Sequence, residues 1–189
     1  MTASRAAYAF AKLKFPGRDK IFLCYLSTMM IPWYVILIPQ FFIMQKLHLY
    51  DTHWSLILTG AFNVFSVFLL RQNMLSIPDS LAEAAKIEGC GPWGIYVKII
   101  LPLCKTSLAT LVVLTFNSVW NDYMGPMIYL DTDSKKTIQL GLATFRRLFD
   151  TDYGAIMAGT TLSLIPVVIL YAVAQKYIVE GIAYAGVKG

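Results

Sequence analysis

Charged residues are scarce in this chain of 189 residues. Asp, Glu, Lys and Arg together make up 14% of the sequence, whereas hydrophobic residues make up 57%. Ordinary soluble domains carry roughly 25% charged residues. A soluble protein this apolar could not cover its surface with polar groups. The scarcity of charge therefore argues against the soluble classes and predicts an all-α, polytopic membrane protein whose solvent is lipid.

The sequence also lacks the patterns that carry common chemistry. It has no G-x-x-x-x-G-K-[ST] phosphate-binding loop, no His-x-x-x-His pair and no Gly-x-Ser-x-Gly nucleophile elbow. Its two histidines, His48 and His53, are five residues apart, a poor spacing for joint metal binding. We therefore expect no catalytic residue, no metal site and no cofactor in this chain, and we do not expect it to be an enzyme.

Cysteine is rare as well. The three cysteines, Cys24, Cys90 and Cys104, form no CxxC pair, so we expect reduced thiols, buried or on the cytoplasmic side. The formal net charge is +5, but the basic residues lie at the ends of apolar runs rather than among aromatics on one face. This placement favours membrane orientation over nucleic-acid binding.

Four apolar runs fill most of the chain. A membrane-spanning helix needs about 20 apolar residues, with about 17 as the lower limit. Pro32 and Pro39 are expected to kink the first run, the Gly125-Pro126 pair to break the third, and Pro166 to bend the last. The predicted spans are residues 21–44, 54–70, 107–130 and 154–177.

Residues at the ends and faces of these runs suggest local roles. Asp51 precedes the second span and suits its N-cap. Arg71 follows that span and can extend its charge to the membrane surface. In the last span, Ala155, Gly159 and Ser163 form a stripe of small residues that suits close helix packing.

Lys and Arg counts indicate the orientation. In a four-span chain the N-terminal segment, residues 71–106 and the C-terminal end share one side. They hold 5, 4 and 2 basic residues when Lys176, at the end of the last span, is counted with Lys188, which is 11 of the 16. Cytoplasmic loops carry the excess of Lys and Arg. We therefore expect both termini and the 71–106 loop in the cytoplasm, and the 131–153 connection outside.

The segment of residues 71–102 is the only long, charged and turn-rich stretch with apolar runs on both sides. Pro78 suits a first helical turn, and Ser80 with Glu83 fits a capping box. Gly89 is placed to end this helix. Local sequence thus predicts a short helix that projects between two spans.

A second short helix is expected to begin at Pro92 and to end before Pro102. Leu81, Ala84, Ala85 and Glu88 fall at helical spacing on one face of the first helix. A projecting helix that ends in small residues can enter a groove on a soluble partner, and Glu83 offers a charge to a basic partner residue. The alternative is a connector that only joins two spans.

The third run carries a polar face near its middle, formed by Asn117, Ser118, Asn121 and Asp122. A charge at the bilayer centre costs roughly 2.5–3.5 kcal/mol, so Asp122 should face a bundle interior or a wet cavity. With Trp120 beside it, the face suits sugars, whose hydroxyls bind amides and carboxylates and whose CH faces stack on aromatics. Hydrogen bonding between helices explains the same face equally well. A proton relay would need a His or Glu partner, and none is in reach by sequence.

One pattern in the loop resembles the EAA loop of ABC importer permeases. It reads Glu83-Ala84-Ala85, three residues, Gly89, nine residues, Ile99, one residue and Leu101-Pro102, with Glu88 where the family usually has Asp. Further segments resemble the maltose-transporter permease subgroup, at residues 7–17, 69–72, 76–78, 120–122, 158–159, 179–182 and 186–189.

The resemblance implies one permease domain over residues 1–189. Family members usually have six spans, so we expect this chain to lack the first one to two. It also implies a multi-pass subunit of a bacterial-type inner membrane that forms part of the path for a sugar or oligosaccharide, with glycerol-phosphate compounds as a minority class. Its EAA loop would couple it to a cytoplasmic ABC ATPase that binds ATP and Mg. Other implied partners are a second permease, an extracellular or periplasmic substrate-binding protein and membrane lipid.

Two rival interpretations remain at this point. A secondary transporter would show paired discontinuous spans in inverted repeats, and the sequence contains no such pair. A structural or non-functional truncated membrane subunit would lack coupling to a partner.

Overall fold

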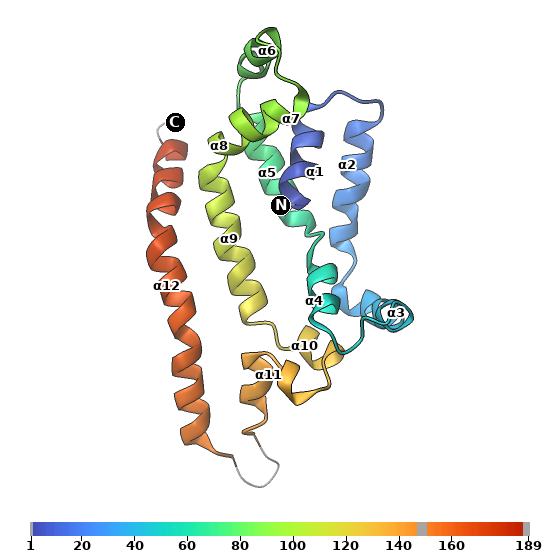
Figure 1. Ribbon diagram of the computed structural model, residues 1–189, viewed down its shortest axis with the longest axis vertical. Helices are drawn as coiled ribbons and strands as arrows, with labels where there is room; N and C mark the ends of the chain where they lie inside the picture. Colours follow the sequence, from blue (N-terminus) through green and yellow to red (C-terminus); the bar gives the residue numbers. More distant parts are fainter. Residues whose placement is uncertain (1, 147–150, 187–189) are drawn as a thin grey trace. The chain divides into compact units, whose positions relative to one another are not determined.

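The structure is a computed structural model that describes residues 2–146 and 151–186, with side chains up to residue 175. Within these ranges every regular element is a helix, and the one β-type contact is an isolated antiparallel bridge between Arg146 and Thr151 (Figure 1). The predicted all-α class is confirmed. The chain forms two compact units: the first holds residues 1–32, 61–111 and 176–189, and the second holds residues 33–60 and 112–175.

The first unit contains the predicted loop and the helices that carry it. Its elements are α1 (Thr2–Lys12), α2 (Arg18–Ser27), η1 (Thr28–Met30), α5 (Val64–Leu75), α6 (Asp79–Ile87), α7 (Pro92–Ile95), the π-helical turn η2 (Tyr96–Ile100), α8 (Leu101–Leu103) and the start of α9 (Lys105–Trp120).

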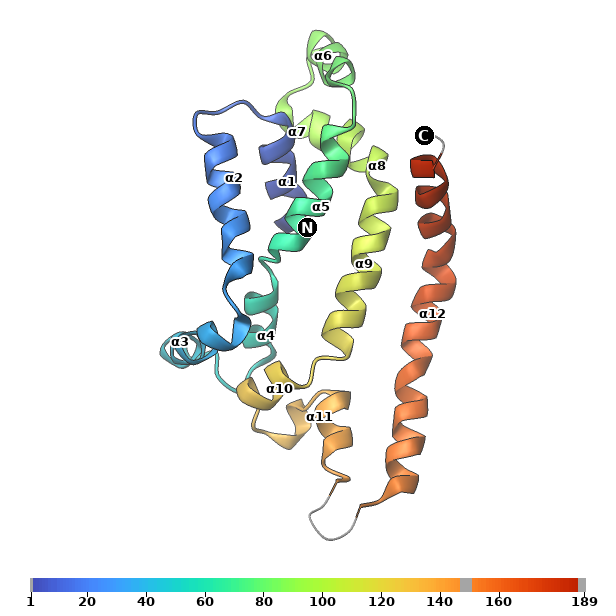
Figure 2. The same ribbon diagram turned by 180° about the vertical axis from the view of Figure 1, so that it is seen from behind.

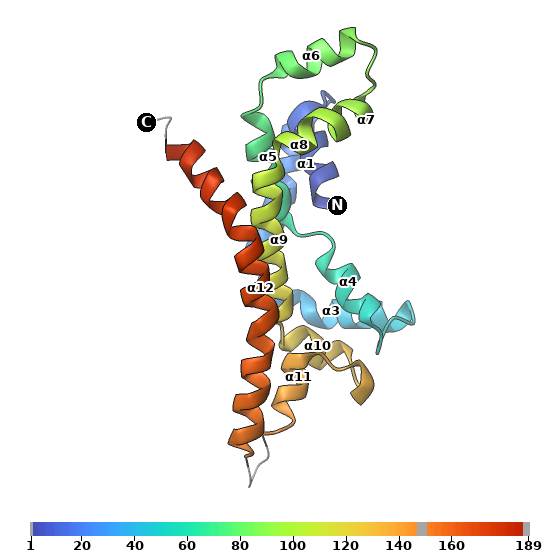
Figure 3. The same ribbon diagram turned by 60° about the vertical axis from the view of Figure 1, so that its left-hand side comes forward.

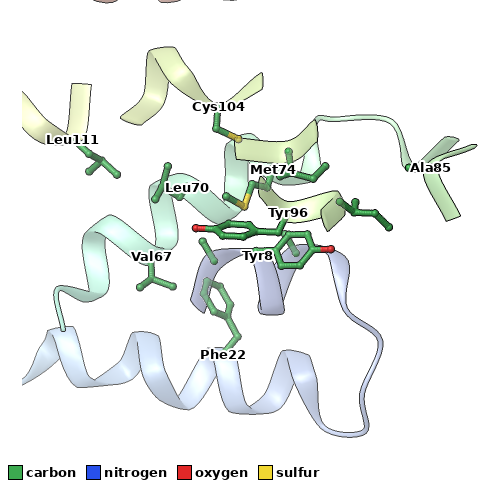
Figure 4. Packing of buried hydrophobic residues seen from close by; sticks show 13 residues of the cluster. Tyr8, Phe22, Val67, Leu70, Met74, Ala85, Tyr96, Cys104 and Leu111 are labelled. Atoms are coloured by element: carbon green, nitrogen blue, oxygen red, sulfur yellow. The ribbon is translucent and has the colours of Figure 1, made fainter. Parts of the chain in front are cut away.

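The core of the first unit lies where α1 packs along α5. Ala7 of α1 is fully buried, and its small side chain lets the two helices approach closely. Leu70 and Met74 of α5 are buried in the same cluster. Figure 4 shows Tyr8 of α1 and Tyr96 of η2 lying side by side next to Met74, and their ring centroids are 5.1 Å apart. The loop is thus attached to a packed apolar core.

The second unit is built mostly from short helices. Its elements are α3 (Trp33–Lys46), α4 (His53–Gly60), α10 (Met124–Tyr129), η3 (Asp133–Lys135), α11 (Ile138–Ala143), the end of α9 and most of α12 (Tyr153–Gly186). Figure 2 shows α10 beside α4, and a backbone hydrogen bond from Asp51 N to Tyr129 O joins the segments next to them.

Only one of the four predicted spans is a single continuous helix. Among the described residues, Tyr153–Gln175 of α12 is by itself long and apolar enough to cross a membrane, as predicted. Three more spans result only if each of three bent helix pairs is counted as one. These pairs are Arg18–Met30 with Trp33–Lys46, His53–Gly60 with Val64–Leu75, and Pro92–Leu103 with Lys105–Trp120.

The prediction of one kinked helix over residues 21–44 is wrong. Helical structure stops at Met30 and resumes at Trp33. Ile31 is extended, with φ −81° and ψ 115°, because a residue before proline is pushed out of the α region. Pro32 therefore ends a helix, whereas Pro39 lies inside α3.

The second predicted span, residues 54–70, is also broken. α4 ends at Gly60, and Asn63 caps a new helix because its side chain accepts a hydrogen bond from Ser66 N at 2.9 Å. α5 then runs to Leu75, so Arg71 lies inside it rather than at its end. The Arg71 guanidinium forms an ion pair with Asp19 at 2.9 Å, whereas the sequence predicted that it would extend to the membrane surface without a partner.

The third predicted span breaks earlier than expected. α9 ends at Trp120, and the Gly125-Pro126 pair lies inside α10 instead of interrupting the helix. Pro126 is in the first turn of α10, where its missing N–H breaks no helical hydrogen bond. The side chain of Asp122 accepts a hydrogen bond from Gly125 N at 3.1 Å and so stabilises the turn.

The stripe of small residues in the last span packs closely, as predicted. A Cβ added at Gly159 would overlap the Leu142 side chain of α11. Ser163 is buried, and its carbonyl accepts a hydrogen bond from Trp120 Nε1 at 3.0 Å. Small side chains on this face of α12 therefore let two other helices lie against it. The three cysteines are free thiols, with Cys104 buried and Cys24 exposed.

Candidate functional site

The first candidate site is the helical loop formed by α6 and α7. Gly89 has φ +84°, a left-handed conformation that suits glycine. Its N–H donates to Lys86 O at 3.0 Å, and the N–H of Cys90 donates to Ala85 O at 2.9 Å. Together these two bonds form a Schellman motif, which ends α6 where the sequence predicts.

The start of α6 differs from the predicted capping box. The helix begins at Asp79 directly after Pro78, and no side chain caps it. Ser80 lies within the first turn, so its pairing with Glu83 as a capping box is wrong. The carboxylate of Asp79 instead accepts a hydrogen bond from Lys12 of α1 at 2.6 Å. The Asp79 side chain therefore makes a tertiary contact and does not cap the helix.

The second short helix begins at Pro92 as predicted, but it does not end before Pro102. It continues as the π-helical turn η2 and then as α8, which runs to Leu103. A proline inside an α-helix would clash with the carbonyl four residues earlier. The wider π turn, in which Leu101 N bonds to Tyr96 O, accommodates the ring of Pro102.

The outward surface of α6 differs in detail from the predicted face. Ala85 is 5% exposed and Ala82 packs against the core, so the inner side of α6 consists of these alanines. Glu83, Ala84, Glu88 and Gly89 are all exposed. The four residues predicted to share a face are therefore divided, because Ala85 turns inward while Leu81, Ala84 and Glu88 remain outside.

Large apolar side chains are exposed beside these residues. Ile87 at the end of α6 is 88% exposed, and Trp93 of α7 is 60% exposed. Figure 3 shows α6 running along α7, with the turn at Gly89–Gly91 joining them. A loop that leaves Ile87 and Trp93 uncovered next to acidic groups has the composition of a docking surface.

The remaining residues of the EAA pattern attach the loop to its unit. Ile99 and Leu101 are half-buried against the apolar core, and Pro102 is exposed. They lie in η2 and α8, which lead directly toward α9. The structure therefore separates the pattern into an exposed part on α6 and an anchoring part after α7.

The loop is also attached to α1. Lys12 Nζ donates to Ile77 O at 2.6 Å and to Asp79 Oδ1 at 2.6 Å. The Tyr8 hydroxyl donates to Pro92 O at 3.0 Å. Hydrogen bonding to Lys12 lowers the pKa of Asp79 below its ordinary value, so the Asp79 carboxylate is charged at neutral pH. Sequence reasoning missed these contacts because they join residues more than 60 positions apart.

The second candidate site is the polar group at the end of α9. Asn117 lies in the last turn of α9, and Asn121 and Asp122 follow its end. Asn121 Nδ2 donates to the backbone carbonyl of Asn117 at 2.8 Å and to its side-chain oxygen at 3.0 Å. The ring of Trp120 stacks on Phe116, with centroids 5.3 Å apart.

These polar residues lie at a helix break and not in the middle of a continuous helix, which corrects the prediction. Asn117 and Asn121 are exposed and Asp122 is half-buried. Gln139 Nε2 of α11 donates to Asn121 Oδ1 at 3.5 Å. The break leaves amide and carboxylate groups available to bind polar groups. The N–H of Trp120, in contrast, is bonded to Ser163 O of α12.

A polar latch in the second unit was not predicted. Asp51 was expected to cap α4, but it has φ +55° and its carboxylate points to another segment. The carboxylate accepts hydrogen bonds from Asp131 N, Thr132 N, Thr132 Oγ1 and Lys135 Nζ, at 2.6 to 3.0 Å. His53 also contacts Lys135 O at 2.9 Å. The latch ties the loop before α4 to η3.

The Asp51 latch predicts a pH dependence. Hydrogen bonds from Lys135, then from Thr132 and the backbone, hold the pKa of Asp51 well below its ordinary value. The latch is therefore fully formed above the unfolded value of about 3.9 and is lost as pH falls through the lower folded value. At pH 7, we expect Asp51→Asn to raise amide exchange of residues 129–136 several-fold, as measured by hydrogen–deuterium exchange.

Asp133→Asn is the matched control for the latch. Asp133 pairs with Lys136 three residues away and is 92% exposed. An exposed pair of this kind contributes little to stability. Equal exchange in both variants would contradict a structural role for Asp51.

The sequence of this chain is similar to those of known proteins. The family described as "Binding-protein-dependent transport system inner membrane component" matches residues 3–184. The arabinooligosaccharides transport system permease protein AraQ of Halalkalibacterium halodurans is 36% identical over 187 residues, which is 99% of this chain and 67% of that protein. The probable ABC transporter permease protein YurM of Bacillus subtilis is 39% identical over 186 residues, which is 97% of this chain and 62% of that protein.

A solved structure is similar in fold as well. A chain of a bacterial ABC transporter involved in the import of the acidic polysaccharide alginate superposes with a TM-score of 0.82 at 30% identity. The match covers 93% of this chain and 69% of that one. This chain thus spans about two thirds of the length of the proteins that it resembles.

Proposed function

Because this chain belongs to the family of binding-protein-dependent transport system inner membrane components, we propose that it is a permease subunit of an ATP-driven importer. In this role it forms part of the translocation path, and α6 couples it to a cytoplasmic ATPase. The ATP and Mg bind to that partner. A second permease and a substrate-binding protein outside the membrane complete the assembly.

The observation that carries the coupling role is the build of α6. A glycine in the left-handed conformation ends the helix, and Glu83, Ala84 and Glu88 are exposed around it. Ile87 adds an exposed apolar side chain at the tip. A short, rigid helix with small and acidic residues on its outer side fits a groove on a soluble partner. Movement of that partner then turns the attached helices as rigid bodies.

We propose a sugar or oligosaccharide as the substrate class. The names of two similar proteins support this, since one carries arabinooligosaccharides and another imports alginate. The amides of Asn117 and Asn121 and the carboxylate of Asp122 offer suitable groups for sugar hydroxyls at the end of α9. Two permeases share the path, so the partner permease supplies the rest of the site.

A tagged pull-down from native membranes in mild detergent, with mass spectrometry, tests the proposed function. We expect a soluble ATPase and a second permease with an EAA loop to accompany the chain. Recovery of the chain alone would contradict the importer role and would favour a purely structural membrane subunit. Uptake driven by an ion gradient without an ATPase would favour a secondary transporter.

A further inference from the structure

One stripe of α1 contacts both ends of the loop that contains α6. Ser4, Tyr8 and Lys12 are four residues apart and therefore lie on one face of the helix. Lys12 binds the chain just before and at the start of α6, and Tyr8 binds Pro92 where α7 begins. The chain segments before and after α6 therefore contact the same helix, α1.

The contact at the entry to α6 is the strongest of these. Only 6% of the Lys12 side chain is exposed, while Asp79 is 74% exposed. The buried ammonium satisfies two acceptors at once, the carbonyl of Ile77 and the carboxylate of Asp79, both at 2.6 Å. A lysine is rarely buried without such partners, because the charge must be removed from water.

The contacts at the exit from α6 reinforce it. The hydroxyls of Ser4 and Tyr96 share a hydrogen bond of 2.8 Å. The Arg5 guanidinium lies 5.4 Å from the centre of the Trp93 ring, and the Tyr8 ring packs on Tyr96. Figure 4 shows Tyr8 and Tyr96 in contact within the core. Both ends of the loop are therefore fixed to α1 by side chains.

We propose that α1 is a clamp that holds the α6 loop in its docking position, with Lys12 as the main positioning residue. The inference rests on the coupling role proposed above for α6. α6 itself packs on the core through Ala82 and Ala85, and the clamp adds polar contacts that fix the chain on both sides of α6. With the clamp, a push on α6 is passed to α1 and to α5, which packs along it, so these helices move together.

Limited proteolysis at Lys86, which is exposed on α6, tests the clamp on the isolated chain. The variant Lys12→Met keeps the apolar stem but removes the donors. We expect it to raise the rate of tryptic cleavage after Lys86 by about fivefold or more, the lower end of typical coupling between sites. Lys12→Arg, which can donate to both acceptors, should restore the original rate.

Two further variants guard against a general loss of folding. Lys14→Met changes an exposed lysine two residues after the end of α1 and should leave the rate unchanged. Asp79→Ala removes the exposed partner and should raise the rate less than Lys12→Met does, because Ile77 O still accepts from Lys12. Equal cleavage in Lys12→Met and the original chain would overturn the clamp.

A second measurement separates the clamp from the proposed function. In proteoliposomes with the copurified partners, we expect Lys12→Met to lower the substrate moved per ATP about fivefold while the same amount of ATPase remains bound. An unchanged ratio would overturn the positioning role of Lys12. If the original chain bound no ATPase, the proposed function would fail, and the cleavage rates would still decide whether the clamp exists.

Discussion

Replacing Gly89 by aspartate is expected to abolish ATP-dependent uptake and to leave the amount of chain in the membrane unchanged. Gly89 ends α6 with φ +84°, and beyond its two chain neighbours no atom lies within 4 Å of the position where a Cβ would be added. An added side chain therefore meets open space within the chain itself. It occupies the tip of the loop, where a docked partner would need close approach.

The Gly89→Asp substitution should reduce the folding stability of the chain only slightly. A residue with a side chain in the left-handed region loses about 1–2 kcal/mol, and aspartate is among the residues that tolerate this region best. Loss of uptake would therefore come from docking and not from unfolding. The measurement is substrate uptake in membrane vesicles supplied with ATP, with the amount of chain determined by immunoblot.

Gly89→Asn is the matched control because asparagine has nearly the same size and also tolerates a positive φ. If the negative charge blocks docking, the asparagine variant should retain measurable uptake. If bulk alone blocks it, both variants should be inactive. Normal uptake by Gly89→Asp would contradict a coupling role for α6.

Local signals in the sequence predicted the loop better than they predicted the spans. Gly89 and Pro92 act on the backbone itself, so the end of α6 and the start of α7 lie where the sequence places them. Hydropathy, in contrast, measures only length and composition. It could not show that Ile31 would be extended or that Asn63 would begin a new helix inside an apolar run.

The contacts that sequence reasoning missed all join distant segments. The Ser80 cap failed because α6 begins at Asp79, which places Ser80 inside the first turn, while the Asp79 side chain binds Lys12. Asp51 failed as a cap because its carboxylate binds a segment about 80 residues later. A polar residue next to a helix has several possible partners, and only the tertiary structure determines which one it binds.

The polar group at the end of α9 shows the same limit. Its residues were identified from sequence, but they were placed in the middle of a helix. The side chain of Asp122 stabilises the turn that follows the helix, by accepting from Gly125 N. A turn at this point explains how a charged residue is accommodated in an apolar run without a charged partner beside it in sequence.

We expect Asp122→Ala to weaken the apparent affinity for the transported sugar about 10- to 100-fold. A hydrogen bond to a charged group contributes about 1.5–3 kcal/mol, which corresponds to a change of this size in binding. Asp122 is half-buried at the break after α9, next to the exposed amide of Asn121. The measurement is the concentration dependence of uptake by the assembled transporter, for the preferred sugar and for close analogues.

Asp122→Asn separates substrate binding from support of the turn. Asparagine keeps an oxygen that can accept from Gly125 N, so the turn should persist, but it removes the negative charge. A carboxylate that binds sugar hydroxyls predicts reduced affinity or altered selectivity in both variants. If the asparagine variant transports normally and only the alanine variant is impaired, the residue acts through the turn. Unchanged kinetics in both would assign the polar group at the end of α9 to packing alone, and the substrate contacts would then have to come from other residues of the path.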